Sequence, residues 1–274
     1  MNIIDPHPHI YSDDRKKYPT IDDPWNPGEP ATAEDLKSRM NDAGVGRAVL
    51  IQTSTFYGHD NRYVMDSTQK YSDWATGVVT LSPDDPRHIE VLEMAVSNYS
   101  VRGLRGTPDQ NGKIGSSNVK RLWTKAREIG IVVNCVVMDD LDRVPEIEAL
   151  ESHLDGLKIV IDHCFMLNTF RNTEETLIAL ERLSALPNVH AKLTSGTHGS
   201  ARVYPHEDMH APLKRVIEAF TPQRCVWGSN FPNALWSKGT SYAQNLSLFT
   251  DEIGLSQSDQ EAILGGTAER LWFS

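Results

Sequence analysis

Hydrophobic and polar positions alternate along the chain in two patterns. Short runs of β-branched and apolar residues are separated by longer segments in which apolar residues recur at helical spacing. The apolar runs predict eight β-strands, at residues 2–5, 48–53, 75–81, 101–106, 131–137, 157–163, 189–195 and 225–230. The helical segments predict α-helices at residues 31–44, 88–99, 117–130, 141–153, 173–186, 210–220, 241–254 and 258–273.

Eight buried strands that alternate with helices in 274 residues predict an α/β fold, a single (β/α)8 TIM barrel that spans residues 1–274 as one domain. The alternative is an open, doubly wound sheet. That fold places a glycine-rich turn after its first strand, and "DPHPH" contains no glycine. The proline-rich segment 19–30 is expected to form a long first loop over the mouth of the barrel. Ser258 is expected to cap the last helix, with Glu261 completing a capping box.

Polar side chains gather at the ends of the predicted strands, where a barrel builds its active site. His7 and His9 lie two residues apart and therefore point to the same side of the first strand. Other polar residues at or just after strand ends, or within the strands, are Gln52, Tyr57, Asn61, Arg105, Asn134, His163, Lys192 and Asn230. The histidines His7, His9 and His163 can bind one divalent metal, most naturally zinc, or act without metal on a carbonyl group.

Three basic residues have more than one interpretation. Arg105 is either a solvated charge at the rim of the barrel or a carboxylate clamp, a role that suits a guanidinium because it donates two parallel hydrogen bonds. Lys192 stands within a buried strand, where it must either meet an anion or reach out of the barrel. Arg202, with His198, lies in the loop after the seventh strand, within reach of a substrate at the mouth of the barrel.

Composition narrows the range of partners. The net charge of −10 disfavours nucleic acid or an anionic membrane as a partner, but a local arginine still allows a small acidic substrate. No apolar run reaches the length of a membrane span, and no leader sequence is expected. Three cysteines are expected as buried free thiols in the cytoplasm. The oligomeric state stays open, and a homo-oligomer is compatible with the sequence.

Seven segments in order resemble the amidohydrolase-related family of metal-dependent hydrolases, most closely its lactonase branch. That branch includes 2-pyrone-4,6-dicarboxylate lactonase, sulfomuconolactonase and sugar lactonases. The segments are "DPHPHIY", "IQTSTFYGHDN", "VRGLRG", "VIDHCF", "HAKLTSG", "VWGSNFPNALW" and "ILGGTAERLW". The resemblance implies that His7, His9 and His163 bind a metal or polarise a lactone carbonyl. It also implies that Arg105 holds a carboxylate, and that Tyr57 and Asn61 line the pocket.

Asn230 departs from the family pattern, which has an aspartate at this position to activate water. An amide cannot take a proton from water as a carboxylate does. Either Asn230 is natural and only orients water while His163 or another group acts as the base, or it is an engineered change, or the chain binds without hydrolysis.

The sequence therefore predicts a hydrolase that opens a lactone, or a related cyclic ester, of a small carboxylated compound. Two alternatives stay open: a metal-dependent decarboxylase of a hydroxyaryl acid, and a non-catalytic binder of small acids.

Overall fold

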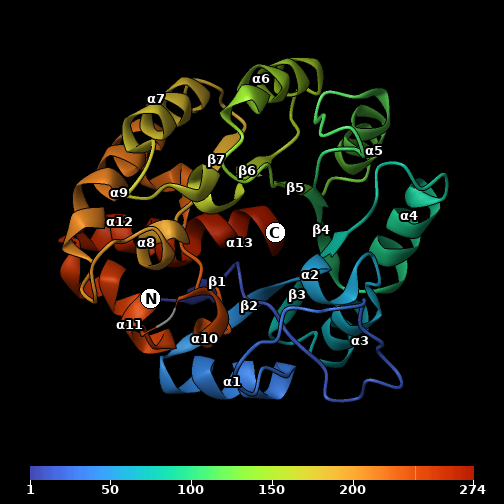
Figure 1. Ribbon diagram of the computed structural model, residues 1–274, viewed down its shortest axis with the longest axis horizontal. Helices are drawn as coiled ribbons and strands as arrows, with labels where there is room; N and C mark the ends of the chain where they lie inside the picture. Colours follow the sequence, from blue (N-terminus) through green and yellow to red (C-terminus); the bar gives the residue numbers. More distant parts are fainter. Residues whose placement is uncertain (238) are drawn as a thin grey trace.

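The computed structural model describes residues 1–237 and 239–274. Its strands form one parallel sheet that runs in chain order and curls into a barrel, with helices around it (Figure 1). The strands are β1 (Ile3–Asp5), β2 (Val45–Ile51), β3 (Ala75–Thr80), β4 (Val101–Gly106), β5 (Val132–Cys135), β6 (Ile159–Ile161), β7 (Val189–Lys192) and β8 (Cys225–Val226). The predicted (β/α)8 barrel is confirmed.

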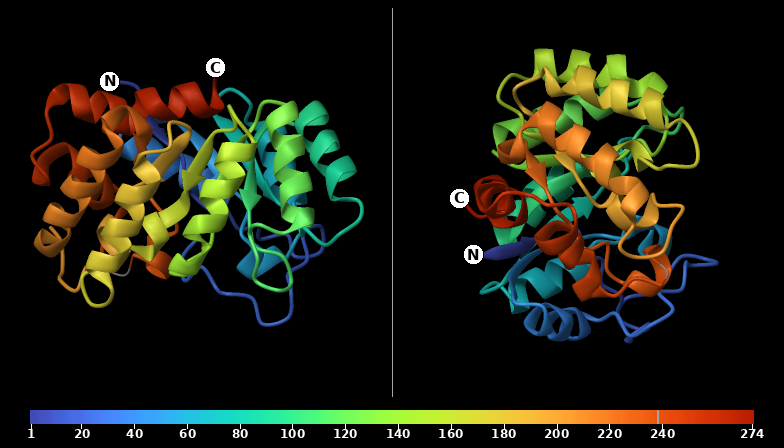
Figure 2. Two further views of the ribbon diagram at one scale, coloured as in Figure 1. Left: turned by 90° about the horizontal axis from the view of Figure 1, so that it is seen from above. Right: turned by 90° about the vertical axis from the view of Figure 1, so that its left-hand side faces the viewer.

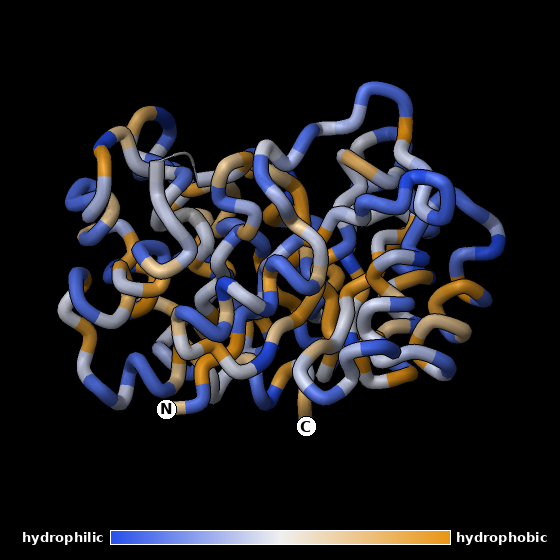
Figure 3. The backbone as a smooth tube through the Cα atoms, turned by 90° about the horizontal axis from the view of Figure 1, so that it is seen from below, coloured by the Kyte–Doolittle hydropathy of each residue, from blue (hydrophilic) through white to orange (hydrophobic). Residues whose placement is uncertain are grey.

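Helices surround the sheet, most of them on its outer face and some across the ends of the barrel (Figure 1). They are α1 (Ala33–Asp42), α2 (Ser54–Tyr57), α3 (Arg62–Lys70), α4 (His88–Asn98), α5 (Ser117–Glu128), α6 (Val144–His153), α7 (Thr173–Ser184), α8 (Ser195–His198), α9 (Glu207–Phe220), α10 (Asn233–Trp236), α11 (Tyr242–Ser247), α12 (Gln257–Glu261) and α13 (Thr267–Trp272). In α5, the Ser116 hydroxyl accepts from the Val119 N–H at the start of the helix. Val119, Leu122 and Ala126 then bury one face of it. Figure 3 shows that the peripheral loops are mostly hydrophilic.

The last predicted helix differs from the expectation. Residues 258–273 are divided between α12, a π-helical turn at Ala262–Gly266, and α13. The cap is Ser256, not Ser258, because the backbone at Ser256 is extended and its side chain accepts from the Asp259 N–H. Helix α3, Arg62–Lys70, was not predicted.

Apolar side chains fill the barrel interior at one end, whereas the other end can carry a functional site. Its apolar filling consists of Ile4, Val49, Ile51, Val78, Val132, Val160 and Val226, against which Trp272 of α13 packs. Both chain termini lie at this filled end (Figure 2). The opposite end, where the strands terminate, is therefore free to carry a site.

The two edge strands of the sheet are joined just beyond their ends. The Asn230 N–H donates to the His7 carbonyl at 3.0 Å, and the His9 N–H donates to the Phe231 carbonyl at 2.9 Å. The seam between β1 and β8 is thus closed by backbone groups of residues that the sequence identifies as site candidates.

Candidate active site

The turn after β1 is fixed by a buried carboxylate. Asp5 accepts from the backbone N–H groups of His7, at 3.2 Å, and Ser229, at 3.0 Å, and from the Tyr242 hydroxyl at 2.8 Å. These hydrogen bonds tie the turn to the segment after β8. As a result, His7 and His9 are held facing the end of β8.

The backbone is left-handed in two segments of the site, one directly after β6 and one after β8. His163, Cys164, Phe165 and Met166 all have positive φ, between 47° and 58°, directly after β6, and Asn230 has φ 55° after β8. Each non-glycine residue in this region carries a cost on the order of 1 kcal/mol. Such strain persists only where surrounding contacts hold it, and it concentrates at functional sites.

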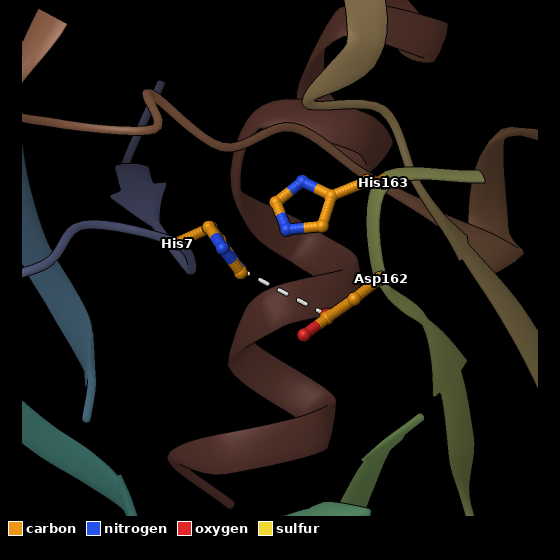
Figure 4. A group of neighbouring side chains, drawn as sticks. All are labelled: His7, Asp162 and His163. Carbon is orange, nitrogen blue, oxygen red and sulfur yellow. Dashed lines mark ion pairs between the residues drawn. The ribbon is translucent and has the colours of Figure 1, made fainter. Parts of the chain in front are cut away.

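A buried ionic layer lies under the site. Asp162 accepts from the Lys192 ammonium at 2.7 Å, and both side chains are 0 % exposed. The Arg105 Nε lies 3.6 Å from Asp162 Oδ2. The Asn134 side-chain amide donates to Asp162 Oδ1 at 3.4 Å. His7 completes the layer, because its Nδ1 lies 3.1 Å from the Lys192 ammonium. The same nitrogen lies 3.8 Å from Asp162 Oδ1, a contact that Figure 4 marks with a dashed line. Two cations therefore flank one buried carboxylate, which offsets part of their charge.

A cavity of about 320 Å³ opens above this layer. Its lining residues are His9, Trp25, Thr53, Ser54, Thr55, Arg105, Val136, Met138, His163, Met166, His198, Asn230, Leu235 and Trp236. Trp25 comes from the proline-rich first loop, as expected. Arg105 is the one arginine or lysine in this lining, and no carboxylate belongs to it, as far as residues 1–237 and 239–274 are concerned.

The imidazoles are neutral at pH 7. Burial, aided by nearby Arg105, lowers the pKa of His9 to about 3, and burial lowers the pKa of His198 to about 4. Burial also holds the pKa values of His7 and His163 well below their usual range. Each ring therefore has one N–H donor and one free lone pair.

Hydrogen bonds assign the ring nitrogens. His9 donates from Nδ1 to the Ile51 carbonyl at 2.9 Å, which leaves its Nε2 with the lone pair. His163 Nδ1 lies 2.7 Å from the Thr194 hydroxyl, and His198 Nδ1 lies 3.4 Å from the Asn230 amide nitrogen. The rings of His163 and His198 are 5.6 Å apart at their centroids.

The family model described as amidohydrolase matches residues 4–273. This chain belongs to the amidohydrolase family. The family expected from the sequence motifs is thereby confirmed.

Curated relatives of this amidohydrolase carry lactonase names. It is 23% identical to a 4-sulfomuconolactone hydrolase of Rhizobium radiobacter, over 84% of this chain and 75% of the relative. It is 24% identical to an L-fucono-1,5-lactonase of Burkholderia multivorans, over 98% and 95%.

Solved structures share the fold over its full length. A putative 2-pyrone-4,6-dicarboxylic acid hydrolase from Pseudomonas putida superposes with a TM-score of 0.82 at 24% identity, covering 99% of this chain and 97% of that one. A Burkholderia multivorans amidohydrolase with bound zinc superposes with a TM-score of 0.79 at 22% identity, covering 99% of each chain.

Most of the predicted site residues converge in this amidohydrolase. The structure brings His9, His163, Arg105 and Asn230 to the cavity. Asn134 lies one layer beneath, beside Asp162. Lys192 lies in the same layer and pairs with Asp162. Of the two alternatives from the sequence, it therefore meets an anion and does not reach out of the barrel. His198 also reaches the cavity.

Predicted residues that do not reach the cavity have other contacts. His7 is 0 % exposed and lies beneath the lining, and its catalytic or metal-binding role stays a prediction. Tyr57 is not among the residues that line the cavity, and its hydroxyl accepts from the Ser12 N–H at 2.6 Å. Arg202 points to the surface, where it pairs with Glu207.

Two amides predicted as pocket residues are structural instead. Gln52 donates to the Gly58 and Asp60 carbonyls, at 2.9 and 3.1 Å, and so holds the loop after β2. Asn61 donates to the Thr80 carbonyl at 2.9 Å and accepts from its N–H at 2.8 Å, which extends β3. Neither residue is among those that line the cavity, and their role in substrate binding stays a prediction.

Sequence reasoning missed Asp162. The signal was present, because Lys192 stands in a buried strand and needs a carboxylate, and Asp162 ends the neighbouring strand. Trp236 was missed as well, since its position in the short helix α10 follows from the fold rather than from a pattern.

The residues present match a metal in spacing but not in charge. Ligand atoms of His7, Asp162 and His163 all lie within 4.8 Å of one another, whereas His9, predicted as a ligand, is outside this group. Metal ligands must be deprotonated nitrogens and free carboxylate oxygens. The Lys192 ammonium already contacts both His7 and Asp162, and Arg105 faces the second carboxylate oxygen. This set does not fit a divalent ion.

Among the described residues, no helix is both long and apolar enough to cross a membrane.

Proposed function

We propose that this amidohydrolase opens a lactone of a small carboxylated compound by water attack on the carbonyl carbon. The observation that carries the proposal is a cavity lined by three neutral imidazoles, those of His9, His163 and His198, together with one guanidinium. The lactonase names of its relatives support it.

The lining favours a substrate with one carboxylate and an apolar part. Arg105 is placed to bind one carboxylate, because its planar group matches two oxygens. Trp25, Trp236 and Met138 offer an apolar wall around the rest of the molecule. A compound with two or more anionic groups would find no second cation in the described lining.

His163 is the candidate for polarising the carbonyl. When the Thr194 hydroxyl donates to its Nδ1, the proton of the neutral ring is on Nε2, which can donate toward an oxyanion. His9 has the opposite arrangement, with its lone pair on Nε2, and can accept a hydrogen bond from the attacking water.

His198 is the candidate base. It contacts Asn230, which occupies the position of the family's aspartate. Burial lowers its pKa to about 4, so the ring is neutral at pH 7 and has a lone pair that can take a proton. The Asn230 Oδ1 has no hydrogen-bond partner among the described residues, so a half-turn of the amide loses no bond. Oδ1 then accepts from His198 Nδ1–H, which leaves the lone pair on Nε2, as in asparagine–histidine pairs of other hydrolases.

The reaction balances with these groups. His198 takes a proton from water as the water oxygen bonds to the carbonyl carbon, and the carbonyl becomes an oxyanion. The bond from that carbon to the ring oxygen then breaks, and His198 returns its proton to the ring oxygen. The product is an open hydroxy acid, which releases one proton to solution at neutral pH.

Proton release from a panel of lactones tests the proposal. The panel contains lactones with one carboxylate and an apolar substituent, with two carboxylates, and with several hydroxyls. We expect the first group to be turned over fastest. Release of carbon dioxide from hydroxybenzoates, with no turnover of any lactone, would contradict the proposal and favour the decarboxylase.

A further inference from the structure

The cluster of His7, Asp162 and His163 under the cavity resembles a metal site, but the Lys192 ammonium already contacts two of its members. Figure 4 shows His7, Asp162 and His163 converging from the ends of β1 and β6. Their ligand atoms lie within 4.8 Å of one another, and all three residues are buried. Two imidazoles and one carboxylate at this spacing are a frequent ligand set for zinc.

Lys192 enters this cluster from β7. Its ammonium is 2.7 Å from Asp162 Oδ1 and 3.1 Å from His7 Nδ1, and the side chain is 0 % exposed. The Trp272 ring lies on its other side, 5.5 Å from the nitrogen. A carboxylate, an imidazole and an aromatic ring therefore surround the Lys192 nitrogen.

The contact with His7 also decides which nitrogen of that ring is protonated. An ammonium has only donors, so His7 Nδ1 must accept from Lys192. The proton of the neutral ring is then on Nε2, and an N–H group is not a metal ligand. Both nitrogens of His7 are therefore withdrawn from coordination, one by the ammonium and one by its own proton.

Asp162 is committed through one of its two oxygens, since its Oδ2 has no hydrogen-bond partner among the described residues. One oxygen is bound to Lys192, and the other faces the Arg105 guanidinium at 3.6 Å. A divalent ion at this carboxylate would sit beside two positive charges in a buried site, where charges are weakly screened.

We propose that the Lys192 ammonium takes the place of a metal ion between His7 and Asp162, so that this member of the family keeps a closed, metal-free form of the site. The inference concerns the residues proposed for hydrolysis, but it does not depend on the reaction. Its direct consequence is that removing the ammonium opens a metal site.

Zinc binding by Lys192→Met tests this. Methionine has a similar length without charge, and its loss of the donor frees His7 Nδ1 and one oxygen of Asp162. After equilibration with zinc and dialysis, we expect less than about one tenth of a zinc per wild-type chain. We expect about one zinc per Lys192→Met chain, bound at least 100-fold more tightly. With cobalt, the variant should gain visible absorption bands that the wild type lacks.

Two further variants serve as controls. Lys158→Met removes an exposed lysine, one that donates to the Asn188 amide oxygen rather than to a carboxylate, and should bind no zinc. Lys192→Met/Asp162→Asn removes both charges, and so should fold without binding zinc. Circular dichroism and melting curves establish that each variant is folded.

Two results would overturn the inference. One is a wild-type chain that retains one zinc after dialysis and loses it on Asp162→Asn. The other is a folded Lys192→Met chain that binds zinc no better than the wild type. If Lys192→Met does not fold, the wild-type zinc content alone decides. None of these readouts uses lactone turnover, so a failure of the proposed reaction would be seen separately.

Discussion

In the proposed reaction, His198 must accept the proton that Asn230, an amide, cannot accept. An amide stands where the family pattern has a carboxylate, and the nearest proton acceptor at the cavity is the imidazole of His198. His198 was noted in the sequence only for its place in a loop, because no spacing pattern marks a residue whose role depends on a contact across the barrel. The same holds for Asp162, whose partner Lys192 comes from the next strand.

The base assignment predicts the behaviour of His198→Gln. Glutamine keeps a polar side chain but cannot accept a proton, so kcat should fall by about 10²–10⁴-fold while KM changes little. Adding Asn230→Asp to this variant supplies a carboxylate at the same place and should recover at least tenfold of the loss. Initial rates of lactone opening measure both effects. An unchanged rate in His198→Gln would refute the assignment.

At the scale of elements, the segment after β8 determines how closely the site can pack. A Cβ at Gly228 would lie 2.7 Å from the His7 Cβ and 2.8 Å from the Thr194 Cγ2. Only glycine allows this approach, which brings β8, β1 and the loop after β7 together around the buried layer.

Gly228→Ala is therefore expected to reduce both stability and rate. The added methyl must displace His7 and Thr194, and overpacking of this kind costs about 1–3 kcal/mol in the free energy of unfolding. Because Thr194 holds His163, kcat should fall as well. Urea unfolding and initial rates provide the two measurements. The matched control is Gly46→Ala. Its Cβ lies 3.2 Å from the Asn2 side chain and 3.7 Å from the Ile3 carbonyl oxygen, so the change should affect neither measurement by much. Equal behaviour of the two variants would contradict the account.

Most strands and helices were predictable because their signals are local. The eight apolar runs match the eight strands, and amphipathic spacing located helices such as α5. The missed helix α3 and the displaced cap at Ser256 lie where turn geometry, rather than periodicity, sets the boundary. The left-handed turn at His163 was not predictable, since nothing local favours four successive non-glycine residues with positive φ.

At the scale of the whole molecule, several buried neutral histidines make stability depend on pH. Burial lowers the pKa of His9 to about 3 and of His198 to about 4, whereas an unperturbed histidine titrates near 6.5. Below pH 6.5 the unfolded chain therefore binds protons that the folded chain does not, and the free energy of unfolding falls as pH falls.

Urea unfolding at pH 7, 6, 5 and 4.5 measures this dependence. Each of these two histidines should contribute a loss of roughly 1.4 kcal/mol per pH unit between about pH 6 and its own pKa. In this range, His198→Gln should reduce the slope of the unfolding free energy against pH by the amount that corresponds to one bound proton. The same slope in the variant and the wild type would show that His198 titrates normally in the folded protein.

The architecture of the whole molecule was predictable from alternation, and the family from ordered motifs, but the division of the site into two layers was not. Whether His7 lies at the cavity or beneath it depends on how β1 and β8 curve toward each other. There the Asn230 N–H donates to the His7 carbonyl and the His9 N–H donates to the Phe231 carbonyl. That curvature is a property of the closed barrel.

Lactone opening in water enriched in oxygen-18 tests the central claim most directly. The best substrate of the panel is incubated with the wild-type protein, and the product is analysed by mass spectrometry. The account predicts one labelled oxygen in the new carboxylate and none in the new hydroxyl group, because water attacks the carbonyl carbon. Label in the hydroxyl group, or a product formed without water, would contradict it.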